Sequence, residues 1–175
     1  QPSGSRSYVT LAYFDITQSN LPNPQGLPNA PSQQEGEASI TGFEIEGVTV
    51  VELPVGDLKL NASASWLDAE DPNGQPFSSI PEEQASIWGE FSPTAMQDLR
   101  LGVGVRYLGD NESGSITTDG YTVADMMVGY DFENWSAMLN VRNLFDEEYY
   151  ATCLARGDCF PGEERTVNLR VARRF

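Results

Sequence analysis

Apolar and polar residues alternate along most of this chain, and a period of two predicts β-strands rather than helices. The clearest case is residues 58–66, where even positions are apolar from Leu58 to Trp66 and odd positions are polar from Lys59 to Ser65. Gly, Pro, Asn and Asp interrupt the alternation at intervals, as turns do. The pattern predicts eight strands, at residues 6–17, 36–51, 57–68, 82–92, 98–109, 120–132, 134–143 and 165–175.

The lengths of these segments and of the gaps between them narrow the fold class. Most of the predicted strands are about twice the usual globular length of roughly 5–6 residues. Every second gap is short (52–56, 93–97 and 133), and the others are longer, up to residues 144–164. In an up-and-down meander, all short turns then lie on one rim and all long loops on the other. This asymmetry is typical of outer-membrane barrels. We therefore predict an all-β, antiparallel up-and-down transmembrane β-barrel, with eight strands in this chain.

Aromatic residues gather where such strands meet the predicted turns. Two belts of rings are expected where a barrel crosses the two membrane interfaces. An open alternative is that aromatic residues simply favour strands. The first strand is ambiguous, because two interleaved sets of its residues are both apolar. The proposed belts are Tyr8, Phe91, Trp135 and Phe175 on the short-turn side, and Trp66, Tyr107 and Tyr121 on the long-loop side.

Charges on the polar face follow an alternation of acidic and basic strands. This places Glu44 and Glu46 next to Lys59, and Asp125 between two arginines, so that cross-strand pairs are expected. Glu90 is likewise expected beside Arg100 and Arg106. A water-filled or plugged lumen accommodates these charges, and a solvated face of a soluble sheet would do so equally well. Arg173 is the exception on the apolar face, where its side chain can extend towards lipid headgroups. The basic residues of the polar face are Lys59, Arg100, Arg106, Arg142, Arg170 and Arg174.

The amino-acid composition excludes or disfavours several common functions, including nucleic-acid binding and histidine-dependent catalysis. The 175 residues, enough for one domain, carry 26 acidic and 10 basic side chains and a net charge of −16, which disfavours nucleic acid as a partner. The absence of histidine excludes Ser-His-Asp and Cys-His catalysis and histidine-containing zinc sites. The sequence contains no run of about 18 apolar residues, so it predicts no membrane-spanning helix. A membrane-spanning β-strand needs only every second residue to be apolar, so a membrane β-barrel is still possible. The many Asp and Glu residues permit catalysis by a pair of carboxylates, as in glycosidases, but the sequence points to no specific pair. We expect no enzyme, and no catalytic, cofactor or metal residue.

The last long gap holds both cysteines, Cys153 and Cys159, with Gly157 between them. Five residues separate the two cysteines, and the glycine among them allows a tight bend, which favours a local structural disulfide. A disulfide implies an oxidising compartment. The alternative of a redox pair lacks the C-x-x-C spacing and a nearby base. The acidic loops offer oxygen ligands for Ca²⁺, above all at residues 68–74, but the full ligand spacing is missing and Pro72 interrupts it. A solvated loop is the preferred interpretation.

The last forty residues contain the motif N-L-F-D-x-x-Y, then two cysteines, then G-x-x-R-x-V and a final Phe. This segment resembles the C-terminal end of TonB-dependent outer-membrane receptors, particularly the ferric-siderophore receptors. Upstream, VTLAYFDITQSN, GFEIEG and GYTVADMMVGYDF are similar to successive barrel strands of that family, so the resemblance covers essentially the whole chain. The matching residues at the C-terminal end are Asn143, Leu144, Phe145, Asp146, Tyr149, Cys153, Cys159, Gly162, Arg165, Val167 and Phe175.

The resemblance implies the last eight strands of a 22-stranded barrel that is filled by a plug domain. It implies a bacterial outer-membrane location, lipid as a partner, and Phe175 as a signal for the barrel-assembly machinery. A ferric siderophore and TonB are implied partners only if the chain is part of a full-length receptor. The sequence has no signal peptide, plug or TonB box, so residues 1–175 are expected to be one barrel domain or a barrel fragment. The alternatives are a stand-alone eight-stranded barrel with a structural or adhesive role, and a soluble ligand-binding β-barrel or sandwich.

Overall fold

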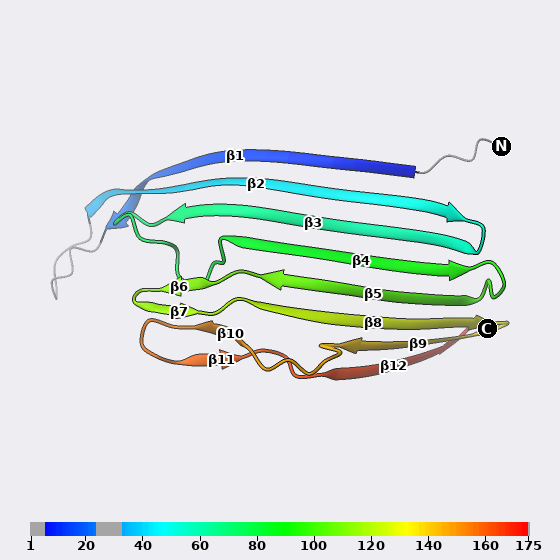
Figure 1. The fold of residues 1–175 in the computed structure, drawn as a ribbon. Coiled ribbons are helices and arrows are strands. Elements are labelled where there is room, and N and C mark those ends of the chain that lie inside the picture. Colours follow the sequence, from blue (N-terminus) through cyan, green and yellow to red (C-terminus); the bar gives the residue numbers. More distant parts are fainter. Residues whose placement is uncertain (1–5, 24–32, 175) are drawn as a thin grey trace.

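The computed structural model describes residues 6–23 and 33–174, and the regular structure in these ranges is entirely β. Eight long strands form one antiparallel sheet in which each strand lies beside its neighbour along the chain (Figure 1). The predicted meander of eight strands is therefore confirmed. Its strands are β1 (Arg6–Asn23), β2 (Gln33–Leu53), β3 (Gly56–Glu70), β4 (Glu83–Pro93), β5 (Leu99–Leu108), β8 (Tyr121–Phe132), β9 (Trp135–Arg142) and β12 (Thr166–Arg173).

Two small hairpins lie in the long loops and were not predicted. One consists of β6 (Asn111–Ser113) and β7 (Ile116–Thr118), and the other of β10 (Tyr150–Cys153) and β11 (Cys159–Pro161). Both extend from the rim that carries the long loops, opposite the short turns (Figure 1). Strands of three or four residues are too short to show an alternating pattern in the sequence.

The two rims differ as predicted. Short connections join β2 to β3, β4 to β5 and β8 to β9, at residues 54–55, 94–98 and 133–134. Glu133 adopts a φ of 46°, a left-handed conformation that suits the two-residue turn. The longer connections at residues 71–82, 109–120 and 143–165 leave from the other rim (Figure 1).

One face of the sheet is apolar and uncovered. Val103 lies opposite Gly89 on one side and Met126 on the other, and the row continues outwards through strands on both sides. Val9 and Leu169 on this face are each 66% exposed. Among the described residues only five apolar side chains are buried, so this sheet has no conventional core. A soluble barrel with a dry interior is therefore the wrong description. The row through Val103 contains Thr49, Leu60, Gly89, Val103, Met126, Val141 and Val167.

The register also settles the ambiguous first strand. Val9, Leu11 and Tyr13 lie opposite Gly47, Ile45 and Phe43 and thus share the apolar face. Tyr8 belongs to the other face, so its placement in an aromatic belt was wrong, and the same holds for Tyr121. The rings of Phe91, Trp135, Trp66 and Tyr107 do lie on the apolar face, near the two rims.

Arg173 lies on the apolar face, as predicted, and its guanidinium carbon is 5.4 Å from the centre of the Trp135 ring. The two residues are direct cross-strand partners of β12 and β9. A cation over the face of an indole is attracted by the ring quadrupole. This contact gives Arg173 a partner close to the short-turn rim.

Glycines on β5 make room for an aromatic ring on the polar face. Trp88 of β4 lies across Gly102 and Gly104, and a Cβ atom at either position would overlap the indole. This packing buries Met127 next to the ring of Trp88. The polar face therefore holds a few large side chains among its charges.

The sheet is open. Within the described residues β1 pairs only with β2, and β12 pairs only with β9. The alternative of a stand-alone, closed eight-stranded barrel is therefore wrong, because the first and last strands do not meet. The predicted assembly signal, Phe175, lies outside the described residues. No helix in the described ranges is long and apolar enough to cross a membrane.

Candidate functional site: lumen face and outer loops

Ion pairs cross the polar face between neighbouring strands. Arg106 Nε lies 2.9 Å from Asp125 Oδ2, which is one of the predicted acid–base neighbours. Arg100 Nη2 lies 3.1 Å from Asp131 Oδ2, so it pairs with β8 and not with Glu90. Opposite charges on one face of adjacent strands stabilise their pairing.

One further charge prediction needs correction. Lys59 lies opposite Glu90 and Val50, whereas Glu44 and Glu46 lie opposite serines of β3. Arg142 lies beside Asp125, as predicted, and its Nη1 also pairs with Glu163 Oε2 of the last loop at 3.5 Å. The face was predicted correctly, but alternation alone does not fix the register of one strand against the next.

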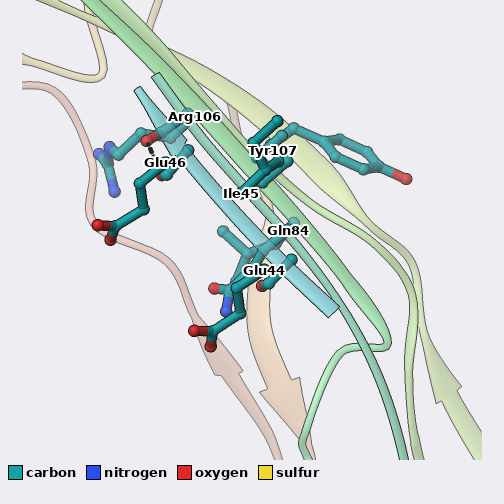
Figure 2. Close-up of a pocket in the computed structure, with 12 residues that line it drawn as sticks. Glu44, Ile45, Glu46, Gln84, Arg106 and Tyr107 are labelled. Carbon is teal, nitrogen blue, oxygen red and sulfur yellow. Dashed lines mark hydrogen bonds between the residues drawn. The ribbon is translucent and has the colours of Figure 1, made fainter. Parts of the chain in front are cut away.

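A polar groove of about 340 Å³ crosses β2 to β5 on this face. In Figure 2, Glu44, Glu46 and Arg106 project to one side of the strands, and the ring of Tyr107 projects to the other. Three serines floor the groove, and the hydroxyls of Ser63 and Ser86 are 2.9 Å apart. Within the described residues, neither Glu44 nor Glu46 makes an ion pair. The groove therefore offers free acceptor groups to a polar ligand or polypeptide.

A second hollow of about 530 Å³ lies farther along the polar face. Trp88, Asp125, Asn140, Arg142 and Asn168 line it. Amide, carboxylate and guanidinium groups beside an aromatic ring can bind a polar molecule with an apolar part. The two hollows lie on the side of the sheet that faces away from the uncovered apolar surface.

Asn143 holds the base of the last long loop against this face. It is 2% exposed and has a φ of 49°, which Asn tolerates better than most residues. Its backbone N–H donates to Asp125 Oδ1 (3.0 Å), and its side-chain Nδ2 donates to the carbonyls of Glu147 (2.8 Å) and Glu163 (3.0 Å). The N–H of Glu147 donates back to Asn143 Oδ1 (2.9 Å). These four bonds join both ends of the loop to the ion pair of the polar face.

Other residues of the C-terminal motif add contacts between the two ends of this loop. Asp146 accepts hydrogen bonds from the backbone N–H (2.9 Å) and Nη2 (3.3 Å) of Arg165. The ring of Tyr149 stacks on that of Tyr121, with centroids 3.9 Å apart. The spacing of the motif thus serves to close the loop.

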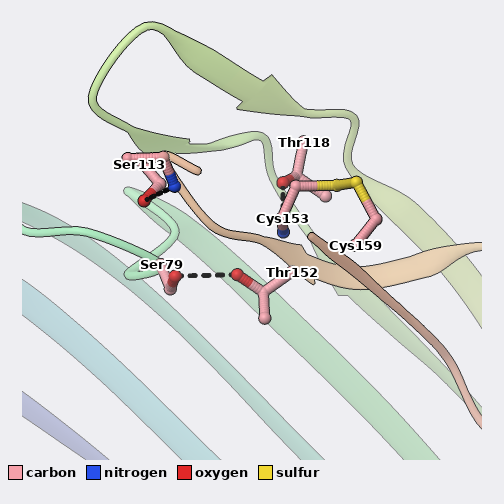
Figure 3. Close-up of a disulfide and its surroundings, with 7 residues drawn as sticks. Ser79, Ser113, Thr118, Thr152, Cys153 and Cys159 are labelled. Atoms are coloured by element: carbon pink, nitrogen blue, oxygen red, sulfur yellow. Dashed lines mark hydrogen bonds between the residues drawn. A yellow bond between two sulfur atoms is a disulfide. The ribbon is translucent and has the colours of Figure 1, made fainter. Parts of the chain in front are cut away.

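Side-chain hydroxyls tie three long loops together at the outer rim. Thr152 Oγ1 donates to Ser79 Oγ at 2.7 Å, and the N–H of Cys153 donates to Thr118 Oγ1 at 2.9 Å (Figure 3). The N–H of Ala155 donates to Ser113 Oγ at 2.9 Å. These hydroxyls were not predicted from the sequence, because single Ser and Thr residues in loops carry no spacing signal. Together they hold the loops as one cluster.

Cys153 and Cys159 are joined by a disulfide in this cluster (Figure 3). They are the terminal cross-strand pair of β10 and β11, so the bond closes the tip of that hairpin. No free cysteine occurs among the described residues.

The acidic segment at residues 68–74 forms a turn. Asp71 Oδ1 accepts from the backbone N–H groups of Asn73 (2.7 Å) and Gln75 (3.0 Å). These bonds, the one from Gln75 first, hold the pKa of the Asp71 carboxyl below its ordinary value. Across the described residues no group of three or more acidic or thiol side chains is arranged to hold a metal ion. The carboxylate thus shapes the loop.

An open meander with a continuous apolar outer face, a charged inner face and one rim of long loops defines a transmembrane β-barrel of the outer-membrane class. The family profile described as TonB dependent receptor-like, beta-barrel, matches residues 3–144. The chain belongs to this family, and its location is the bacterial outer membrane.

The relatives that this chain resembles in sequence include siderophore receptors and an outer-membrane transporter. The Ferrioxamine B receptor of Salmonella typhimurium is 30% identical over 95% of the chain, and the match covers 26% of that relative. The Ferrichrome outer membrane transporter/phage receptor of Escherichia coli K12 is 31% identical over 95% of the chain and is covered to 24%. The chain thus spans about a quarter of the length of these relatives.

Solved structures agree with the fold. The ferric-catecholate import receptor Fiu from Escherichia coli K12, in a closed form, is 28% identical and superposes with a TM-score of 0.76 over 95% of this chain and 25% of its own. The pyoverdine receptor FpvA of Pseudomonas aeruginosa, bound to pyoverdine, gives a TM-score of 0.79 at 23% identity, over 97% of this chain and 27% of its own. The first of these structures is an import receptor, and the second is an outer-membrane receptor.

Proposed function

We propose that this chain is the C-terminal barrel portion of a TonB-dependent receptor that imports ferric siderophores across the outer membrane. The observation that carries the proposal is the match of 95% of the chain, at 30% identity, to a ferrioxamine B receptor. The polar grooves of the inner face and the clustered outer loops support it, because an imported solute must pass a hydrated, hydrogen-bonding surface.

In this proposal residues 1–175 act as one barrel domain in binding and transport, without catalysis and without a resident cofactor. Lipid covers the apolar face, and TonB supplies energy through parts of the receptor beyond the region matched here. The barrel-assembly machinery recognises Phe175. The loop cluster around Ser79 and Thr152 contributes to capture of the ferric siderophore at the outer rim.

The proposal is tested in a strain that lacks its other siderophore receptors. The gene at its full encoded length is expressed under iron limitation, and uptake of radioactive iron is measured with hydroxamate and catecholate siderophores in turn. Uptake of at least one of them is expected, and it should disappear when TonB is deleted. Absence of uptake for every siderophore, with the receptor present in the outer membrane, would contradict the proposal.

A further inference from the structure

An aromatic cluster lies on the apolar face beside the short turn between β8 and β9. It consists of Tyr130, Phe132 and Trp135, and Phe132 is the cross-strand partner of Trp135. The ring centroids of Tyr130 and Phe132 are 5.8 Å apart, and all three residues are exposed. Aromatic rings at the ends of membrane-spanning strands are typical of the level at which a barrel meets the lipid headgroups.

Arg173 brings a positive charge to the edge of this cluster. The end of β12 lies at the same rim as the β8–β9 turn (Figure 1), and Arg173 is the direct cross-strand partner of Trp135. Its guanidinium carbon lies 5.4 Å from the centre of the Trp135 ring, and the residue is exposed. Stacking uses the flat face of a guanidinium, whereas its five N–H donors lie in the plane of the group. The stack thus gives a cation with in-plane donors a defined position at the membrane interface.

Charges on the apolar face are separated by the row through Val103. Between that row and the short turns, the described strand residues of this face carry one charge, that of Arg173, and Glu133 belongs to the adjoining turn. The short-turn end of the face therefore complements an anionic headgroup layer. On the other side of the row, towards the long loops, the strands carry the acidic residues Asp15, Asp68, Glu70 and Glu83.

The orientation of the barrel identifies the headgroups beside Arg173. In outer-membrane barrels the short turns lie on the periplasmic side. The lipids at this level are therefore those of the periplasmic leaflet, where phospholipids present a phosphate next to the aromatic rings. An arginine binds phosphate oxygens through two parallel N–H bonds, whereas a lysine acts as a point charge. The charge, the donors and the neighbouring rings thus match one kind of partner, a phospholipid with a net negative charge.

We propose that Arg173, held in place by Trp135, binds the phosphate of an anionic phospholipid in the periplasmic leaflet. Tyr130 and Phe132 contact the glycerol and the upper acyl region of the same lipid. The inference goes beyond siderophore import, because it concerns the partner that fixes the depth of β9 and β12 in the membrane. It rests only on the outer-membrane location of the chain.

Native mass spectrometry tests the site with the protein at its full encoded length in micelles of an uncharged detergent. The probes are phosphatidylglycerol and phosphatidylcholine with identical acyl chains, and the ratio of the two retained lipids is measured. Arg173→Gln should lower this ratio about fivefold, which corresponds to the roughly 1 kcal/mol that one basic residue contributes at an anionic lipid surface. Arg170→Gln is the matched control, because it removes the same charge from the polar face of the same strand, opposite Met138, and should leave the ratio unchanged.

Two further variants separate the stack from the charge. Arg173→Lys keeps the charge but loses the flat donor group, so the ratio should fall less than in Arg173→Gln. Trp135→Leu removes the ring that positions the cation and should also lower the ratio, and an unchanged ratio would refute the stacked site. An unchanged ratio in Arg173→Gln, or an equal fall in Arg170→Gln, would overturn the proposal, because the site would then have no part in the lipid preference. Heat-modifiable migration in a gel shows that each variant is folded.

Cross-linking decides the proposal without any variant. Phosphatidylglycerol with a photoreactive headgroup is added to the parent protein in phosphatidylcholine vesicles, and the labelled peptides are identified. Adducts should concentrate at residues 130–135 and 171–174, and excess unlabelled phosphatidylglycerol should remove them. Adducts spread evenly over the short-turn rim, or removed equally well by inorganic phosphate, would overturn the proposal. Cross-links to a second copy of the chain at these residues, in place of lipid, would overturn it too.

An uptake measurement keeps this inference separate from the proposed function. Siderophore uptake per folded receptor should be the same in Arg173→Gln and in the parent protein. Loss of import with lipid binding intact would contradict the proposed function alone, and loss of the lipid preference leaves the import proposal standing.

Discussion

Gly162 lies against the face of the Tyr149 ring, and its N–H donates to the carbonyl of Tyr149 at 2.7 Å. A Cβ atom at position 162 would overlap the ring, so only glycine fits there without displacing the tyrosine. The contact joins the two arms of the last loop next to the Tyr121–Tyr149 stack. It explains why a glycine and a tyrosine stand at these places in the C-terminal motif.

Gly162→Ala should therefore destabilise the loop by about 1–3 kcal/mol, the usual cost of overpacking. The change is measured by urea unfolding in lipid vesicles and by protease cleavage between residues 143 and 165. Gly47→Ala is the control, because its Cβ would meet only ordinary contacts, Val9 Cγ2 at 3.8 Å and the Tyr8 carbonyl oxygen at 3.9 Å. Tyr149→Ala should make Gly162→Ala harmless, and an undiminished effect in the double variant would show that the ring is not the cause.

Asn143→Ala should release the last loop from the polar face. The substitution removes three hydrogen bonds to the backbone of Glu147 and Glu163, and each such bond contributes about 0.5–1.5 kcal/mol. Faster proteolysis of the loop and faster hydrogen exchange at Glu147 are expected. Asn134→Ala, on a short turn, serves as the control. If the last loop were equally protected from proteolysis and hydrogen exchange in both variants, the bonds of Asn143 would not hold the loop.

Val103→Arg should interfere with membrane insertion. Val103 lies midway along β5 on the apolar face and is 57% exposed, and an arginine near the bilayer midplane costs about 2–4 kcal/mol. The amount of heat-modifiable protein in the outer membrane measures the effect. Glu46→Arg on the polar face should be tolerated. Were the two variants equally abundant, the apolar face would not contact lipid.

The turn at Asp71 should lose order in acid. Its carboxyl pKa is lowered in the folded loop, so the bonds to Gln75 and Asn73 stabilise the turn at pH values above the ordinary carboxyl pKa. This stabilisation disappears as the pH falls from about 4 through the lowered pKa. Hydrogen exchange of the amides of Asn73 and Gln75 should accelerate in that range. Asp71→Asn should remove the pH dependence, and a turn that opens at the same pH in both proteins would exclude this carboxylate.

The sequence alone predicts much of this fold, because a strand with one apolar and one polar face has residues of the two kinds in alternation. Six of the eight predicted strands agree with the structure within two residues at both ends, and the apolar face was assigned correctly. The partners of Lys59 and Arg100 were not, since register depends on turn geometry that the pattern does not contain. Asn111 and Thr118 carried no signal, because their importance comes from burial between loops that are far apart in the chain.

The unequal lengths of the connections have a consequence for the order of folding. Closing a loop costs about 0.6 kcal/mol more for each doubling of its length. The two-residue links at 54–55 and 133–134 and the link at 94–98 therefore favour early pairing of β2 with β3, β8 with β9 and β4 with β5. We therefore expect three hairpins to form first, each starting from the rim with the short turns, and the long connections to join them afterwards. On this expectation, the loops that face the outside of the cell are the last to take their final shape.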